Sequence, residues 1–346
     1  MKSALITFSL SALLIGPLIT NAQSTSNKTP LSEFSQQLVL PTYQSLAERS
    51  GILVKTVKAV VESPSAKTVT GARQAWVATR EPWEMSEAFL FGPVDTEGHD
   101  PNLDSWPVNV TDLKKVINPT TGPETLDVKA VESLSEGARG FHVVEYLLFA
   151  DLEGQSISPE RTAELLKSDP RRGAYLIAAT EALDAQADAL LADYAPSGKN
   201  FVGEIAKAGT GSEVYLTHAA ALSEIVNAMA GIADESSQEK LLAPAEASDV
   251  TLLESRFSGN TLTDVLNNIA GIQRAAVIIQ PVLNNETLQT ELTKAVSDYQ
   301  ASVEAIPATF NQKPGSTKSA VEKAAVAGAA LRDLIEQKIV PAVRQS

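Results

Sequence analysis

The chain has 346 residues, of which 44% are hydrophobic and 20% charged, and it contains no cysteine. This composition is that of a globular protein with a substantial core, and it excludes disulfides and thiolate chemistry. The formal net charge of −14 argues against nucleic-acid binding, because a polyanion would be repelled.

The first 22 residues have the pattern of a cleaved secretory signal. Lys2 supplies a charged start, residues 4–19 form an apolar stretch that is short for a membrane span, and Thr20 and Ala22 place small residues before a cut. We therefore expect cleavage near Ala22 and a periplasmic or otherwise exported product. The mature chain is expected to have no transmembrane segment.

Apolar residues recur with helical spacing over most of the remaining chain, and strand-like alternation is nearly absent. In residues 174–194, for example, Leu176, Leu183 and Leu190 fall on one stripe while Glu181 faces outward. The pattern predicts an all-α protein of two packed helical bundles. Helices are predicted over residues 31–62, 66–89, 126–151, 159–168, 171–194, 198–207, 210–234, 261–281, 286–304 and 317–344.

Two long polar stretches, residues 92–122 and 236–259, interrupt the helical pattern. Loops of this length are usually functional or disordered, and the apolar anchors of the first one favour function. A domain boundary is expected near Pro196. The predicted domains are residues 23–196, which include the 92–122 loop, and residues 197–346.

Residues 141–150, FHVVEYLLFA, are apolar except for His142 and Glu145. A segment that is apolar on all sides predicts a buried helix, and residues three apart share a helix face. An ionised carboxylate buried alone is very costly, so Glu145 needs a partner, either His142 or a ligand that both residues hold. Gly140 weakens a helix, which indicates that another backbone or a ligand comes close. A structural ion pair and a metal or ligand site both stay open.

Other candidates precede this helix. Arg80 and Glu84 have the spacing of an ordinary exposed ion pair, whereas Glu87, followed by apolar residues, is a candidate third carboxylate of the site. Asp104 either caps local amides or reaches the groove. His99 lies in an acidic loop that would bind a divalent ion or simply be solvated.

The remaining aromatic and histidine residues have packing as their default role. Trp76 and Trp83 share a helix face, so they pack in the core or line a groove. Trp106 is expected to anchor its loop. His218 lies in a largely apolar segment and is expected to be a packed core residue.

GFHVVEYLLF resembles the GxHxxE signature of the imelysin family, which includes imelysin-type peptidases and iron-regulated exported proteins. The blocks AWVATREPWEMSEAFLFGP (75–93), LDSWPVN (103–109) and LESRFSGNTLTDVLNNIAGI (253–272) are similar to further blocks of that family. The resemblance implies a two-domain helical fold whose halves are related, pseudo-symmetric bundles, with the signature in the groove between them.

The leading hypothesis is an exported protein that binds a metal ion or small ligand and is associated with iron acquisition. The expected metal ligands are His142, Glu145 and Glu87, a nitrogen and oxygen set that suits Fe or Zn. Other periplasmic or outer-membrane iron-uptake proteins are the expected partners. The residues expected to line the groove are Arg80, Trp83, His99, Asp104, Trp106 and Gly140.

Two alternatives remain. A metallopeptidase would hold zinc on His142 and Glu145 and use Glu87 as a base, although no recognisable hydrolytic centre is present. An interaction scaffold would use the His142–Glu145 pair only as a buried salt bridge.

Overall fold

The computed structural model describes residues 29–345, so the predicted signal peptide, residues 1–22, lies outside the described residues. Within residues 29–345 the only strand-like pairing is an isolated bridge between Ala150 and Ser156, and the prediction of an all-α protein is confirmed. None of the helices in this range combines the length and apolar character that crossing a bilayer demands.

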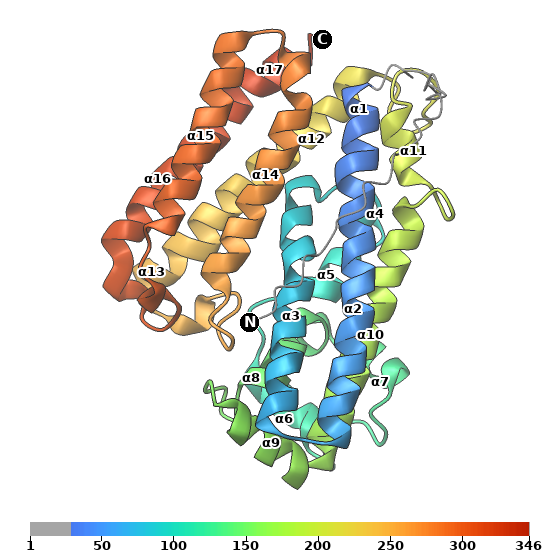
Figure 1. The fold of residues 1–346 in the computed structure, drawn as a ribbon, viewed down its shortest axis with the longest axis vertical. Coiled ribbons are helices and arrows are strands. Elements are labelled where there is room, and N and C mark those ends of the chain that lie inside the picture. The colour runs from blue at the N-terminus through green and yellow to red at the C-terminus, as the bar shows by residue number, and fades with distance from the viewer. Residues whose placement is uncertain (1–28, 346) are drawn as a thin grey trace, which may run out of the picture.

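Three long helices, α2 (Leu40–Glu62), α3 (Ala66–Ser86) and α10 (Pro170–Tyr194), form the frame of the first bundle. α2 packs against both of the others (Figure 1). A π-helical turn, Phe34–Val39, joins α2 to α1 (Pro30–Glu33). The shorter helices around this frame are α4 (Pro93–Thr96), α5 (His99–Asp104), α6 (Val110–Ile117), α7 (Val128–Glu132), α8 (Phe141–Phe149), α9 (Pro159–Ser168) and α11 (Phe201–Ala206).

The second bundle lies beside the first and is drawn in yellow to red in Figure 1. Its long helices are α12 (His218–Ser237), α14 (Thr261–Leu283), α15 (Glu286–Glu304) and α16 (Lys318–Leu334), with α13 (Ala243–Ala247) and α17 (Val340–Val343) between or after them. A π-helical segment, Gln238–Leu242, extends α12, and another, Ile335–Ile339, joins α16 to α17.

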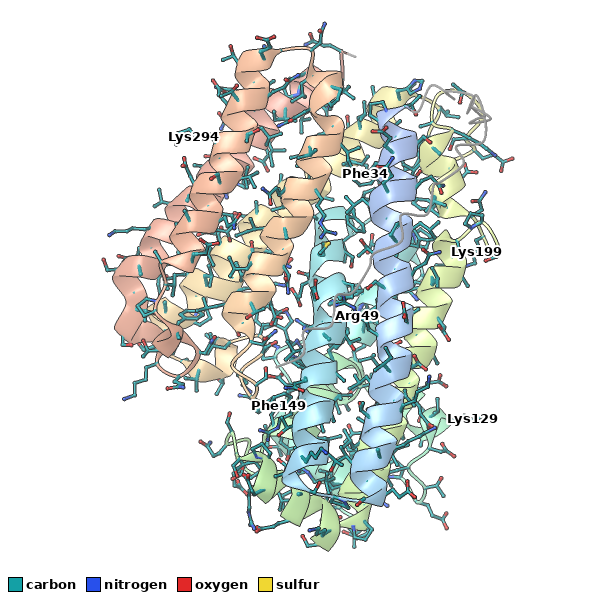
Figure 2. The ribbon with its side chains drawn as sticks, viewed as in Figure 1. Phe34, Arg49, Lys129, Phe149, Lys199 and Lys294 are labelled. Carbon is teal, nitrogen blue, oxygen red and sulfur yellow. The ribbon has the colours of Figure 1, made fainter. Side chains whose placement is uncertain are left out.

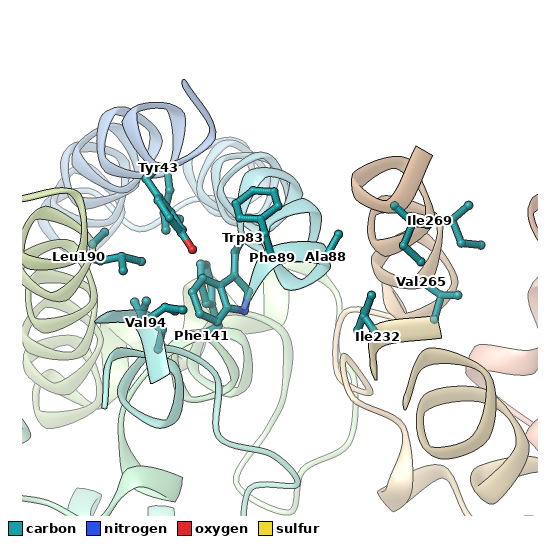
Figure 3. Packing of buried hydrophobic residues seen from close by; sticks show 14 of the residues in the cluster. Tyr43, Trp83, Ala88, Phe89, Val94, Phe141, Leu190, Ile232, Val265 and Ile269 are labelled. Carbon is teal, nitrogen blue, oxygen red and sulfur yellow. The ribbon is translucent and has the colours of Figure 1, made fainter. Parts of the chain in front are cut away.

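The two bundles meet where α3 packs along α14. Gly271 permits this approach, because a Cβ there would lie 2.2 Å from the carbonyl oxygen of Met85. The apolar core continues across the contact, with Ala88 facing Ile269 and Val265 (Figure 3). α11 packs against α1 and α10. The domain boundary at residue 196 and the pseudo-symmetry stay predictions.

Two predicted helices differ in the structure: one is divided and one begins later than expected. The 126–151 helix is instead α7, a 3-10 turn (Glu136–Ala138) and α8, because Gly140 has a φ of +82° that no helix allows. The 210–234 helix begins at His218, capped by Thr217, since Gly209 and Gly211 also have positive φ. The predicted 92–122 loop contains α4, α5 and α6.

Candidate functional site

His142 and Glu145 lie on one face of α8, which is buried along its whole length. Nδ1 of His142 lies 3.0 Å from Oε2 of Glu145. The other carboxylate oxygen, Oε1, accepts hydrogen bonds from the backbone amides of Phe257 and Ser258 at 3.0 and 2.7 Å and from the Ser258 hydroxyl at 2.7 Å. Glu145 therefore joins α8 to the second bundle.

Gly140 brings α5 against the start of α8. A Cβ at this position would lie 2.4 Å from the carbonyl oxygen of Leu103, so the close neighbour that the sequence indicated is another backbone. This close approach also places Asp104, which follows Leu103 in the chain, next to His142. Oδ1 of Asp104 lies 3.0 Å from Nε2 of His142.

We expect Gly140→Ala to lower the free energy of unfolding by about 1–3 kcal/mol, because it combines a strained positive φ with a backbone clash. Urea unfolding followed by circular dichroism measures this change. Gly137→Ala is the matched control, since nothing lies within 4 Å of its added Cβ. Equal unfolding midpoints for the two variants would contradict the role assigned to Gly140.

Asp104 is held from α3. Its Oδ2 accepts a hydrogen bond from the indole of Trp83 at 2.5 Å, and its Oδ1 accepts one from Arg80. Trp83 packs beside Phe141 in the core (Figure 3). Burial alone would raise the pKa of Asp104, but the charges of Arg80 and His142 outweigh burial and hold it well below its usual range.

Arg80 lies at the centre of a cluster of charged side chains. It pairs with Glu84, so the expected exposed ion pair is instead fully buried. It also lies 3.2 Å from Glu254 and 3.6 Å from Asp264, both of the second bundle. Asp264 accepts further hydrogen bonds from Ser255 and Asn260.

Lys240, in the π-helical segment after α12, is a second buried cation in the cluster. Its Nζ lies 2.6 Å from Glu87, 3.0 Å from Glu254 and 3.3 Å from Glu84. The amide of Asn268 donates to the carboxylates of Glu87 and Glu84 at 2.7 and 2.8 Å. Lysines elsewhere, such as Lys129, Lys199 and Lys294, point outward (Figure 2).

We call this set the charge cluster: the cations Arg80, Lys240 and His142 and the carboxyl groups Glu84, Glu87, Asp104, Glu145, Glu254 and Asp264. Carboxyl groups outnumber cations in it. Burial, with the neighbouring charge of Glu84, raises the pKa of Glu254 to about 8. Burial likewise raises the pKa of Asp264 to about 7. The cluster therefore favours an added positive charge, either protons or a bound cation.

Several buried polar atoms of the cluster accept no hydrogen bond from residues 29–345. They include Oε2 of Glu254 and Oδ1 of Asn268, whereas Oε1 of Glu254 lies 3.0 Å from Lys240 and 3.2 Å from Arg80. Nε2 of His142 lies 3.0 Å from Oδ1 of Asp104, with which the protonated ring forms an ion pair. Ligand atoms of Asp104, His142 and Glu254 lie within 4.8 Å of one another, as do those of Glu84, Glu87, Asp104 and Glu254.

A cavity of about 230 Å³ adjoins the cluster. Glu87, Asp104 and the predicted groove residue Trp106 line it, together with Asp100 and Glu235. The Glu235 side chain is 44% exposed. An acidic path of this kind would attract cations toward the cluster.

The structure brings most of the predicted site residues together, through Asp104 and Arg80, but not all of them. His99 lies apart, where its ring contacts Asp193 and Gln186 of α10. Trp76 packs in the core, as expected, and donates to the Phe141 carbonyl at 3.0 Å. The prediction that His218 is packed is wrong, because it is exposed at the start of α12.

Sequence reasoning missed Lys240, Glu254, Asp264 and Asn268. Asp264 and Asn268 fall on the apolar stripe of α14 with Gly271 and Ala275, and polar residues on such a stripe are a usable signal. Lys240 and Glu254 lie in the polar 236–259 stretch, where no periodicity marks them as buried.

Comparison with known proteins gives consistent matches over nearly the whole chain. The family model for imelysin, peptidase M75, matches residues 39–339. An iron-regulated protein A from Synechococcus elongatus is 30% identical over 335 residues, which are 92% of this chain and 87% of that protein.

Two solved structures share the fold. One, of an iron-regulated protein A precursor from Parabacteroides distasonis, has a TM-score of 0.75 at 23% identity and covers 94% of this chain and 96% of its own. The other, of an imelysin-like protein from Psychrobacter arcticum, has a TM-score of 0.70 at 16% identity, with coverage of 90% and 94%.

Proposed function

Because this chain belongs to the imelysin family, we propose that it binds a metal cation in the charge cluster between its bundles. The proposed ligands are the carboxylates of Asp104 and Glu254 and Nε2 of His142, which releases its proton when the cation binds. A cation there would offset the surplus of buried carboxylates, whose isolation is costly.

The observation that carries this proposal is the convergence of buried ligand atoms from Asp104, His142 and Glu254, which lie within 4.8 Å of one another. Oε2 of Glu254 accepts no hydrogen bond within residues 29–345, and both Glu254 and His142 are almost completely inaccessible to solvent. Buried polar atoms normally have partners, and these lie close enough to share one ion.

We assign Glu145 to orienting His142 rather than to binding the ion. Its oxygens already accept from Ser258, Phe257 and Nδ1 of His142. A carboxylate on one ring nitrogen fixes the tautomer and leaves the other nitrogen for a metal. Glu87, paired with Lys240 and Asn268, borders the cavity and is assigned to the approach path.

The ligand set and the relatives together favour iron. One imidazole with carboxylates suits Fe, Zn or Mn and disfavours Cu(I). The relative from Synechococcus elongatus is named an iron-regulated protein. Together with the secretory pattern of residues 1–22, this name supports an exported protein that takes part in iron acquisition. Its partners would be other iron-uptake proteins.

Binding is favoured over peptide hydrolysis by the burial of the site. A peptidase must present a metal-bound water to a polypeptide. The side chains of His142 and Asp104 are only 1% and 2% exposed, and the adjoining cavity of about 230 Å³ suits an ion rather than an extended peptide.

Metal binding by the chain from residue 23 onward tests the proposal. Calorimetry with Fe(II), Fe(III), Zn(II) and Mn(II) is expected to show one tight site. Metal affinity should fall by about 10–100-fold in Glu145→Gln, the range for a residue that orients a ligand, and further in His142→Ala.

His218→Ala is the control, since His218 is exposed. It should bind as the unchanged protein does. If none of the four ions bound, or if folded His142→Ala bound them equally well, the charge cluster would have only a structural role. That result would favour the interaction scaffold.

A further inference from the structure

A second opening between the bundles lies outside the charge cluster. This groove has a volume of about 840 Å³. Residues 107–110 and 153–156 of the first bundle line it, with residues 250–252, Arg256 and residues 311–312 of the second. Because both bundles contribute to it, a molecule bound here would contact both.

Arg256 is a guanidinium without a counter-ion in this groove. It donates one hydrogen bond, from Nη2 to the Val108 carbonyl at 3.2 Å. Within residues 29–345 its Nε and Nη1 donate none, and no carboxylate forms an ion pair with it. Such an arginine is uncommon, because a partly desolvated charge is costly without a partner.

The carboxylates near Arg256 are committed elsewhere. Glu145 is saturated by α8 and the 257–258 amides, and Asp249 accepts from the amide and hydroxyl of Thr251 at 2.8 Å. Glu153, also on the groove wall, pairs with Lys114 at 2.6 Å. Burial lowers the pKa of Arg256, and Glu145 and Asp249 offset this only partly. Within residues 29–345 none of these carboxylates contacts the Arg256 guanidinium directly, so the guanidinium is available to a carboxylate of a ligand.

The remaining lining suits a polar molecule. The guanidinium carbon lies over the Phe257 ring, 4.5 Å from its centroid. Asn311 also lines the groove, but its Oδ1 is buried within the protein. Gln155, Thr251 and Gln312 add further donors and acceptors.

We propose that this groove binds a small carboxylate anion, with Arg256 as the main contact and the exposed side chains of Gln155, Thr251 and Gln312 as partners for a ligand hydroxyl. A planar guanidinium matches a carboxylate with two parallel hydrogen bonds. The ligand needs no metal, so the proposal is independent of the metal site. The two sites share the segment 256–258, whose amides hold Glu145.

Calorimetric titration of the metal-free protein with citrate tests this site. The metal-free protein is prepared by dialysis against a chelator, which is then removed. Citrate carries both the carboxylates and the hydroxyl that the groove would recognise. It is expected to bind, and Arg256→Gln should weaken it by about tenfold or more, the value of one charge-assisted contact. Arg256→Lys keeps the positive charge but loses the planar guanidinium that can form two parallel hydrogen bonds. Its affinity for citrate should therefore be intermediate.

Three comparisons complete the test. Arg161→Gln, at an exposed arginine paired with Glu164, should bind citrate unchanged. His218→Ala, at an exposed histidine outside both sites, should also bind it unchanged. Tricarballylate, which is citrate without the hydroxyl, should bind more weakly. No citrate binding at millimolar concentration, equal binding by Arg256→Gln, or equal binding of inorganic phosphate would overturn the proposal.

Discussion

Replacing Arg80 by glutamine is expected to lower the free energy of unfolding by about 3–5 kcal/mol at neutral pH. Arg80 has no exposed surface and contacts Glu84, Asp104, Glu254 and Asp264. Removing its charge leaves these carboxylates buried without their shared cation. This loss costs far more than the hydrogen bonds alone, because the protein interior screens charge poorly.

Urea unfolding at equilibrium measures the effect. Arg49→Gln is the matched control, because Arg49 forms a single ion pair with Glu81 and both side chains are about one-third to one-half exposed. That pair is expected to contribute about 1 kcal/mol or less. If Arg80→Gln were as mild as Arg49→Gln, Arg80 would not be the centre of the charge cluster.

The metal-free protein is expected to lose stability as the pH rises from about 5 to about 9. Burial raises the pKa of Glu254 to about 8 and that of Asp264 to about 7. Burial alone would lower the pKa of His142, but Asp104 and Glu145 raise it to about 10.

The direction follows from comparison with the unfolded chain. Each of these three groups has a higher pKa folded than unfolded, where carboxyl groups titrate near about 4 and imidazole near about 6.5. The stability that they contribute is complete below the unfolded values and is lost as pH rises through the folded ones. Asp104, whose pKa is lowered, contributes stability above its unfolded value and loses it only in stronger acid.

Thermal unfolding in chelator across this pH range checks the prediction. Glu254→Gln removes one of the titrating groups, so its melting temperature should change less steeply with pH. A melting temperature that rises from about pH 5 to about pH 9 would have the wrong sign and would contradict the protonation assigned to the charge cluster.

Helical periodicity was enough to predict the fold class, since α10 and α14 carry continuous apolar stripes. Helical periodicity wrongly predicted one continuous helix through residues 126–140. The helix is interrupted at Gly140 because the Leu103 backbone packs against it, a contact that only the tertiary structure shows. The helix boundary before His218 was likewise hidden, because glycine conformations in the 209–211 turn are not visible in a hydrophobic pattern.

The pairing of His142 with Glu145 could be predicted because both lie on one short helix. The role of Glu145 in orienting His142 could not be predicted, because its amide partners Phe257 and Ser258 come from a distant segment. Lys240 shows the same limit. Its burial depends on packing between bundles and not on its neighbours in sequence, which are polar.

Anomalous diffraction from crystals of the chain from residue 23 onward, grown with Fe(II) or Zn(II), tests the central claim most directly. We predict one strong peak bonded to Nε2 of His142 and to carboxylate oxygens of Asp104 and Glu254, with Nδ1 still on Glu145. Crystals without a peak in the charge cluster, in which His142 keeps its contacts with Asp104 and Glu145, would contradict the account.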